Sequence, residues 1–232
     1  MRQIVLDTET TGLSFIEGDR VIEVAAVEFL NGEPTGKEFY SLIDPERDVP
    51  AEATEVHGLT NKHLEGQPKF GEIMQGLLDF CEGAELIIHN APFDVGMINN
   101  EISLTGSTTV IEEVAHTIID SLRVARAKHP KQRNDLDSLG ERYNIDLSER
   151  AEGHNARVDC KILGKMYHAL IQGVDLSVMD YSARTDHEVV RVQRTGALPK
   201  IAVSAEDRQS NEARLDEMES KGVAVVARRM KM

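Results

Sequence analysis

The 232-residue chain is short of cysteine, of long apolar runs and of positive charge. Its two cysteines, Cys81 and Cys160, lie far apart and lack the spacing of metal ligands, which predicts two reduced, buried thiols. No apolar run reaches the length of a transmembrane helix, and the N-terminus enters a strand pattern at once, so neither a membrane partner nor a signal peptide is expected. These shortages predict a cytoplasmic protein.

The deficit of positive charge limits what the chain can bind by itself. The formal net charge is −14, from 26 Lys and Arg against 40 Asp and Glu. Because phosphate affinity comes mostly from Lys and Arg, the chain is not a generic nucleic-acid binder. The acidic excess lies in residues 1–174, since residues 175–232 hold ten groups of each sign. This division suggests a cation-using catalytic body with a separate interaction element, although a solvated acidic surface explains most of the charges equally well.

Apolar periodicity predicts the fold class of the body. Apolar, β-rich stretches predict strands in residues 2–9, 20–33, 37–45 and 84–90, with a hairpin turn after the second. Helical spacing recurs in residues 69–83, 91–106, 135–145 and 155–173, residues 116–130 read as a strand end followed by a helix, and residues 54–66 as loop and short helix. Strands early in the chain and helices interleaved later predict an α/β domain with a mixed sheet flanked by helices.

The periodicity weakens after residue 173. Residues 175–198 are expected to form a linker after the domain of residues 1–174. Residues 199–232 recover a structured pattern, but this tail is too small to bury a core of its own. It is then either a frayed terminus or a docking element that orders on a partner, and we favour docking.

Two acidic residues end the first predicted strand. Asp7 and Glu9 follow the apolar residues 4–6, and side chains two positions apart in a strand share one face. Like charges placed side by side repel, and partial burial increases the cost. Two interpretations follow: both carboxylates are solvated at a strand end, or a divalent cation lies between them.

Three later residues support the cation. Asp94 lies in the first turn of a predicted helix, and His154 and Asp159 lie around the start of the last helix of the body. Each has an ordinary explanation by itself, as a capping carboxylate or a structural histidine. Together with Asp7 and Glu9 they form four carboxylates and an imidazole, the set that suits phosphodiester hydrolysis with two metal ions. A neutral His154 could take a proton from the attacking water.

Three short motifs resemble, in order, those of the DEDD exonuclease superfamily. They are "DTETTG", "HNAPFD" and "HNARVD", and the last fits the His-containing branch pattern H-x-A-x-x-D. The resemblance implies a ribonuclease H-like fold and a 3′-to-5′ exonuclease activity with two Mg²⁺ or Mn²⁺ ions. It implies four metal ligands and one general base, namely Asp7, Glu9, Asp94 and Asp159, with His154.

The chain further resembles the epsilon proofreading subunits of bacterial DNA polymerase III. In that family a Glu and a His in the segment similar to "VPAEATEVHGLT" touch the terminal nucleotide, and Glu52 and His57 fall on those positions. The resemblance thus implies that they bind the DNA 3′ end, together with Asp7, Glu9 and Asp159. It also implies that residues 199–232 dock on the polymerase alpha subunit. Residues 175–179 resemble a degenerate sliding-clamp motif.

Three functions are compatible with these features of the sequence. The first is a proofreading exonuclease subunit that removes mispaired 3′-terminal nucleotides, with the polymerase supplying the DNA affinity and the tether the local concentration. The second is a free-standing exonuclease acting on short RNA or single-stranded DNA, against which the family-like tail counts. The third is a scaffold without catalysis, against which the complete set of carboxylates and His154 counts. The sequence favours the first.

Overall fold

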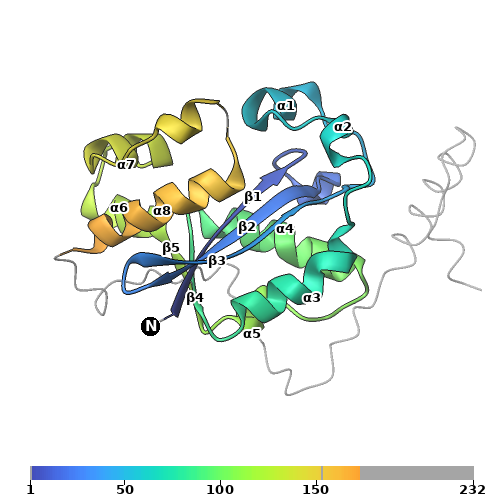
Figure 1. Cartoon of the computed structure of the whole chain (residues 1–232), viewed down its shortest axis with the longest axis horizontal. Helices are drawn as coiled ribbons and strands as arrows, with labels where there is room; N and C mark the ends of the chain where they lie inside the picture. The colour runs from blue at the N-terminus through green and yellow to red at the C-terminus, as the bar shows by residue number, and fades with distance from the viewer. Residues whose placement is uncertain (1, 153, 173–232) are drawn as a thin grey trace, which may run out of the picture. The chain divides into compact units, whose positions relative to one another are not determined.

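A five-stranded mixed sheet lies at the centre of the fold (Figure 1). The computed structural model describes residues 2–152 and 154–172. The strands are β1 (Arg2–Thr10), β2 (Val21–Leu30), β3 (Glu33–Leu42), β4 (Glu85–Ile88) and β5 (Thr117–Asp120), in the order β3-β2-β1-β4-β5. β1 pairs antiparallel with β2 and parallel with β4, so the sheet changes direction at β1.

Helices cover both faces of the sheet. One face packs against α3 (Phe70–Cys81), α4 (Ala91–Leu104) and α5 (Ile111–Val114). The other packs against α6 (Ser121–Lys128), α7 (Leu136–Arg142) and α8 (Ala156–Ile171). Two short helices, α1 (Ala51–His57) and α2 (Asn61–Leu64), follow β3. The described residues also include the 3-10 turns η1 (Phe15–Glu17) and η2 (Ser148–Glu152).

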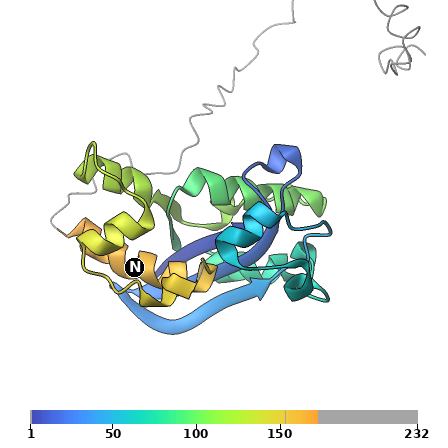
Figure 2. The ribbon, with the colours of Figure 1, turned by 90° about the horizontal axis from the view of Figure 1, so that it is seen from above.

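The alternation of side chains in β1 decides which residues face which helices. Ile4 and Leu6 are buried with α3 and α4, whereas Val5 is buried with α8. Because side chains alternate between faces, Asp7 and Glu9 continue the face of Val5 and point toward α8. Figure 2 shows the ribbon from above, turned by 90° from the view of Figure 1.

The predicted α/β class is confirmed, with small differences at the boundaries. β3 begins at Glu33, four residues before the predicted stretch, because Asn31 and Gly32 have φ of 54° and 86° and form a two-residue turn that pairs Leu30 with Glu33 directly. α5 and η2 were not predicted, since each spans only one short turn. The ranges 175–198 and 199–232 lie outside the described residues.

The two cysteines are free and buried, as predicted. Burial raises the pKa of the Cys81 thiol to about 12, which keeps it protonated and inert. Of the helices in the described ranges, none combines the length and apolarity needed to cross a bilayer.

Candidate active site

The predicted carboxylates meet where β1 ends. Asp7 and Glu9 stand on one face of β1, opposite Ala25 and Glu23 of β2. Asp94 lies in the first turn of α4, and Asp159 lies in the first turn of α8. Three chain segments distant in sequence therefore bring their acidic groups to one point.

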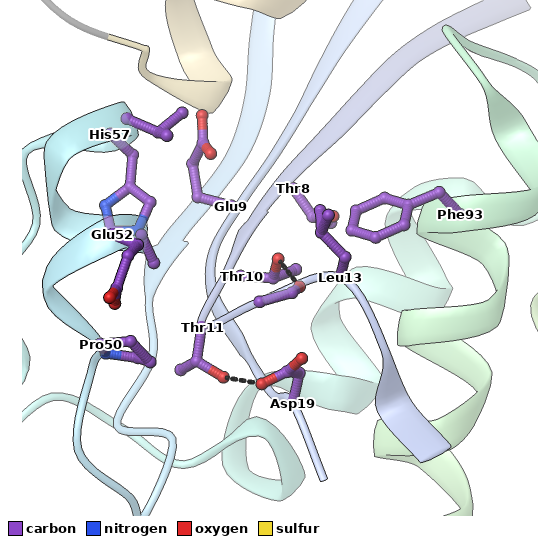
Figure 3. A pocket seen from close by; sticks show the side chains of 13 residues that line it. Thr8, Glu9, Thr10, Thr11, Leu13, Asp19, Pro50, Glu52, His57 and Phe93 are labelled. Atoms are coloured by element: carbon purple, nitrogen blue, oxygen red, sulfur yellow. Dashed lines mark hydrogen bonds between the residues drawn. The ribbon is translucent and has the colours of Figure 1, made fainter. Parts of the chain in front are cut away.

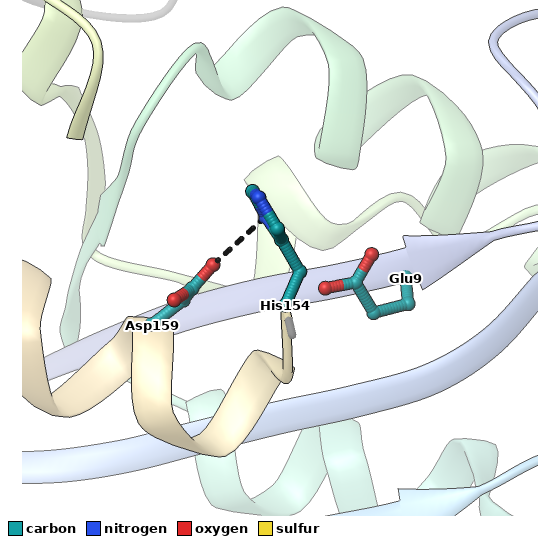
Figure 4. Close-up of side chains that lie close together, drawn as sticks. All are labelled: Glu9, His154 and Asp159. Atoms are coloured by element: carbon teal, nitrogen blue, oxygen red, sulfur yellow. Dashed lines mark ion pairs between the residues drawn. The ribbon is translucent and has the colours of Figure 1, made fainter. Parts of the chain in front are cut away.

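Glu9, His154 and Asp159 form the tightest part of this cluster. One ligand atom from each lies within 4.8 Å of those of the other two (Figure 4). His154 Nδ1 lies 3.6 Å from Asp159 Oδ2, so this ring nitrogen faces the carboxylates. A carboxylate, an imidazole and a second carboxylate at this spacing could share one divalent cation.

Burial, together with the neighbouring acids, raises the pKa values of Asp7, Glu9 and Asp94. Burial raises the pKa of Asp7 well above its ordinary value, and the charges of Asp94, Glu9 and Asp159 raise it further. Burial, followed by the charge of Glu23, raises the pKa of Glu9 to about 8. Burial also raises the pKa of Asp94 to about 7, although hydrogen bonds from Thr8 oppose that shift.

The donor set of the site suits a divalent metal. Without a cation, burial and the neighbouring negative charges favour the protonated forms of Asp7 and Glu9 at neutral pH. A bound divalent ion would stabilise their ionised forms, and carboxylate oxygens are the ligands that Mg²⁺ and Mn²⁺ prefer. The donor set therefore fits the metal that the sequence predicts.

Asp94 is held in place by β1. Its Oδ1 accepts hydrogen bonds from the Thr8 backbone N–H at 3.1 Å and from the Thr8 hydroxyl at 2.7 Å. Asp94 is 3% exposed. Thr8 points to the α4 face of β1, whereas Asp7 and Glu9 point to the other face. The acidic cluster thus spans the end of β1 from both faces.

Glu23 positions the start of α8, and sequence reasoning missed it. This fully buried carboxylate accepts hydrogen bonds from Asn155 Nδ2 at 2.9 Å, from the Ala156 backbone N–H at 3.0 Å and from the Tyr40 hydroxyl at 2.7 Å. Asn155 is the N-cap of α8 and follows His154 directly. A lone acid within the apolar run "VIEVAAV" was the signal that could have identified Glu23.

Arg150 is a second residue that the sequence did not reveal. Its Nε donates to Asp159 Oδ1 at 2.7 Å, and its Nη2 donates to Asp159 Oδ2 at 3.1 Å. The same Nη2 lies 3.0 Å from His154 Nδ1. Arg150 belongs to the charged run "SERAE", where nothing distinguishes it from a solvated residue.

A cavity of about 510 Å³ adjoins the acidic cluster (Figure 3). Glu9 lies in its wall, and so do Glu52 and His57 of α1, the two residues predicted to contact substrate. Glu52 is exposed, whereas His57 is 6% exposed. The fold therefore brings every predicted site residue to the cluster or to the adjoining cavity.

A backbone hydrogen bond defines the tautomer of the His57 ring. Its Nδ1 accepts the backbone N–H of Leu59 at 3.0 Å, so in the neutral ring the proton resides on Nε2. Burial lowers the pKa of His57, which favours this neutral form. The ring is consequently a hydrogen-bond donor through Nε2.

Comparisons with known proteins agree with this geometry. Residues 4–167 match the exonuclease family RNase_T. The chain is 37% identical over 231 residues to DNA polymerase III subunit epsilon of Escherichia coli (strain K12), covering 95% of both chains. It is 43% identical over 174 residues to the subunit of the same name from Rickettsia typhi (strain ATCC VR-144 / Wilmington), covering 75% of each.

Solved structures share the fold at lower identity. The nuclease domain of 3′hExo, a DEDDh family member, bound to rAMP is 16% identical with a TM-score of 0.63, covering 75% of this chain and 92% of that one. Exonuclease X in complex with 5′ overhanging duplex DNA is 19% identical with a TM-score of 0.56, covering 74% and 92%. The chain therefore belongs to the exonuclease family RNase_T, a family that depends on a divalent metal.

Proposed function

We propose that the chain is the 3′-to-5′ proofreading exonuclease subunit of a bacterial replicative DNA polymerase, which removes mispaired 3′-terminal nucleotides. The observation that carries the proposal is the meeting of the acidic cluster and His154 beside a cavity of about 510 Å³. Similarity to epsilon subunits over nearly the whole chain supports the assignment to a replicative polymerase.

The acidic residues and His154 have distinct roles in this proposal. Asp7, Glu9, Asp94 and Asp159 would hold two Mg²⁺ or Mn²⁺ ions, which supply Lewis acidity and an activated water when bound. His154 accepts the proton of the attacking water at Nδ1, the ring nitrogen that faces Asp159.

The cavity is suited to the terminal nucleotide. Leu13, Val56 and Phe93 give it apolar surface on which a base and a sugar can pack. The Glu52 carboxylate, on the same wall, accepts a hydrogen bond from the 3′-terminal hydroxyl. His57 would donate from Nε2, which is buried at the cavity wall, because its Nδ1 already accepts from the Leu59 N–H.

The partners are inferred from the sequence. A chain with a net charge of −14 gains little from the phosphate backbone, so another protein has to supply the DNA affinity. We assign residues 199–232 to docking on the polymerase alpha subunit and residues 175–179 to a weak contact with the sliding clamp. A tether of this kind raises the local concentration of the primer end.

A reconstitution tests this function. The full chain is mixed with the replicative polymerase subunit of the same organism, and the co-purified complex is given a primer with a mispaired 3′ end and Mg²⁺. We expect co-purification and removal of the mispaired nucleotide before extension, both absent when an unrelated acidic protein replaces the chain. A chain that degrades free single-stranded DNA or short RNA but does not co-purify would be a free-standing exonuclease instead.

A further inference from the structure

The Arg150 side chain places a cation inside the acidic cluster. Two of its nitrogens pair with the two oxygens of Asp159, at 2.7 and 3.1 Å. A third nitrogen, Nη1, bonds to Asp137. The Arg150 side chain is 10% exposed, so this is a partly buried, bidentate ion pair rather than a solvated surface contact.

The position of Arg150 also affects the proposed base. Arginine donates hydrogen bonds and accepts none, so in the contact with Nη2 the His154 Nδ1 is the acceptor. The neutral imidazole then carries its proton on Nε2, and neither ring nitrogen has a free lone pair. With Arg150 in this position, His154 cannot accept a proton from water.

A cavity beside the guanidinium has room for a second position of the Arg150 side chain. A separate cavity of about 390 Å³ is lined by Asp137, Glu141, Leu147, Arg150 and His154. Asp137 already bonds to Arg150 Nη1, and Glu141 adds a second carboxylate that is not among the groups that Arg150 contacts. Rotation of the Arg150 side chain would thus exchange Asp159 and His154 for Glu141 while the ion pair to Asp137 is retained.

We propose that Arg150 is a positioning residue that occupies the place of a cation in the metal-free site. It holds Asp159 and His154 together until a divalent ion binds. With a divalent ion bound, the Arg150 side chain would lie in the cavity of Asp137 and Glu141, which would leave Asp159 free as a ligand and His154 Nδ1 free as a base. This inference rests on the proposed function for the roles of Asp159 and His154.

Metal binding and thermal stability test the proposal without an activity assay. Mn²⁺ binding to the full chain is measured by titration calorimetry, and melting is followed in EDTA and in saturating Mn²⁺. Arg150→Gln should bind Mn²⁺ roughly fivefold more tightly or better, because no internal cation competes. Its melting temperature should fall in EDTA, and the increase on adding Mn²⁺ should exceed that of the wild type.

Two further variants separate displacement from a general effect of charge. Arg150→Lys keeps the charge but cannot bridge both Asp159 oxygens and His154, so it should also bind Mn²⁺ more tightly than the wild type. Glu141→Gln should weaken Mn²⁺ binding about twofold, because the displaced guanidinium loses a partner. Arg126→Gln on the exposed face of α6 is the matched control and should leave Mn²⁺ affinity unchanged.

The results distinguish this inference from the proposed function. If Arg150→Gln and Arg150→Lys bind Mn²⁺ no more tightly than a metal-binding wild type, the displacement is wrong while the metal site and the proofreading role stand. If the wild type binds no Mn²⁺, both the site assignment and the displacement are wrong. A chain that binds Mn²⁺ as expected but fails to co-purify with the polymerase subunit loses only its proposed role in proofreading.

Discussion

Asp7 has four acidic side chains near it and is one of the four carboxylates expected to bind the metal ions. The charges of Asp94, Glu9, Asp159 and Glu23 all act on its carboxyl group. We expect Asp7→Ala to lower exonuclease activity by roughly 10³-fold or more, since loss of one ligand disturbs both metal positions. The measurement is release of nucleotides from a 3′-ended oligonucleotide in Mg²⁺.

The thermal stability of Asp7→Ala shows whether its loss of activity results from a loss of folded protein. Removing one of several mutually repelling carboxyl groups should leave the melting temperature in EDTA unchanged or raised. Asp79→Ala on the exposed face of α3 is the matched control and should keep full activity. Wild-type activity of Asp7→Ala would show that the site is assigned wrongly.

The shifted acids also predict how the metal-free protein responds to pH. The pKa of Glu9 is raised from 4.5 to about 8, and that of Asp94 from 3.8 to about 7. The folded chain therefore binds protons more tightly than the unfolded chain, so these groups favour folding below pH about 4 and lose that advantage as pH rises to about 8. In EDTA, their contribution to the melting temperature should fall across this range, and Mn²⁺ should restore it at pH 8.

Comparison with Glu9→Gln isolates this contribution from other titrating groups. The variant cannot ionise at position 9, so its melting temperature in EDTA should decline less between pH 5 and 8 than that of the wild type. Thermal melts in a series of buffers measure both. Parallel curves for the two proteins would contradict the raised pKa of Glu9.

Glu52 and His57 are expected to act on substrate rather than on metal. Both line the cavity, and neither belongs to the tight group of Glu9, His154 and Asp159. The double variant Glu52→Ala, His57→Ala should weaken binding of a single-stranded 3′ end roughly tenfold, by loss of two hydrogen bonds. Mn²⁺ affinity should stay at the wild-type value. Equal affinity of the double variant and the wild type for the oligonucleotide would exclude the pair from substrate binding.

At the scale of elements, a buried ion pair fixes α4 against β2. Arg20 pairs with both oxygens of Glu101, at 2.8 Å each, and Glu101 also accepts the Val21 backbone N–H at 3.0 Å. Glu101 is 1% exposed and lies in the same helix as Asp94. The pair therefore links the helix that carries a metal ligand to the start of β2.

Removing the Glu101 carboxylate should destabilise the folded protein. Glu101→Ala leaves Arg20 and the Val21 N–H without their acceptor, which should lower the free energy of unfolding by about 3 kcal/mol. Glu113→Ala, on the exposed side of α5, should change it by less than about 0.5 kcal/mol. Denaturant titration of both proteins measures the difference, and equal values would show that the pair contributes nothing.

Helices could be predicted from the sequence where their apolar side chains recurred over enough residues to define a period. The predicted helical segments of residues 69–83, 91–106 and 155–173 correspond to α3, α4 and α8, and the same-face rule placed Asp7 beside Glu9 correctly. Helix η2 could not be predicted, because five residues hold too few apolar positions to define a period.

The supporting contacts of the site depend on tertiary structure alone. Glu23 and Asn155 are 132 positions apart, and only the packing of α8 on β2 brings them into hydrogen-bond contact. Arg150 likewise meets Asp159 through the turn before α8. Local sequence patterns contain the metal ligands at strand ends and helix starts, and the lone acid in "VIEVAAV" marks Glu23 itself. They contain no signal for which residues will meet it across the fold.

At the scale of the whole molecule, the uneven distribution of charge suggests that one part of the chain performs catalysis and another part brings it to the DNA. Residues 1–174 carry 16 basic against 30 acidic groups, whereas residues 175–232 are balanced. An acidic body repels the phosphate backbone, so recruitment through residues 175–232 would decide how often the primer end reaches the cavity. The expected contact with the sliding clamp, at residues 175–179, is part of this recruitment.

Residues 175–179, Asp-Leu-Ser-Val-Met, resemble clamp-binding peptides of the form Gln-Leu-Ser/Asp-Leu-Phe. Met179 takes the place of the aromatic residue, and it can fill an apolar pocket but gives up ring area and rigidity. Asp175 takes the place of the Gln, and a carboxylate cannot donate the hydrogen bonds of an amide. The contact should therefore be weak and effective only through the tether.

Substitutions toward the stronger motif test this contact. The double variant Asp175→Gln, Met179→Phe should bind the clamp of the same organism roughly tenfold more tightly, since it regains the amide donor and the aromatic ring. Leu176→Ala should remove the binding of the wild type, because it empties the pocket for the leucine. Affinity is measured in solution with the full chain, and Ser182→Ala just beyond the motif is the control. If neither the double variant nor Leu176→Ala changes the affinity, residues 175–179 serve only as a linker between the catalytic body and the tail.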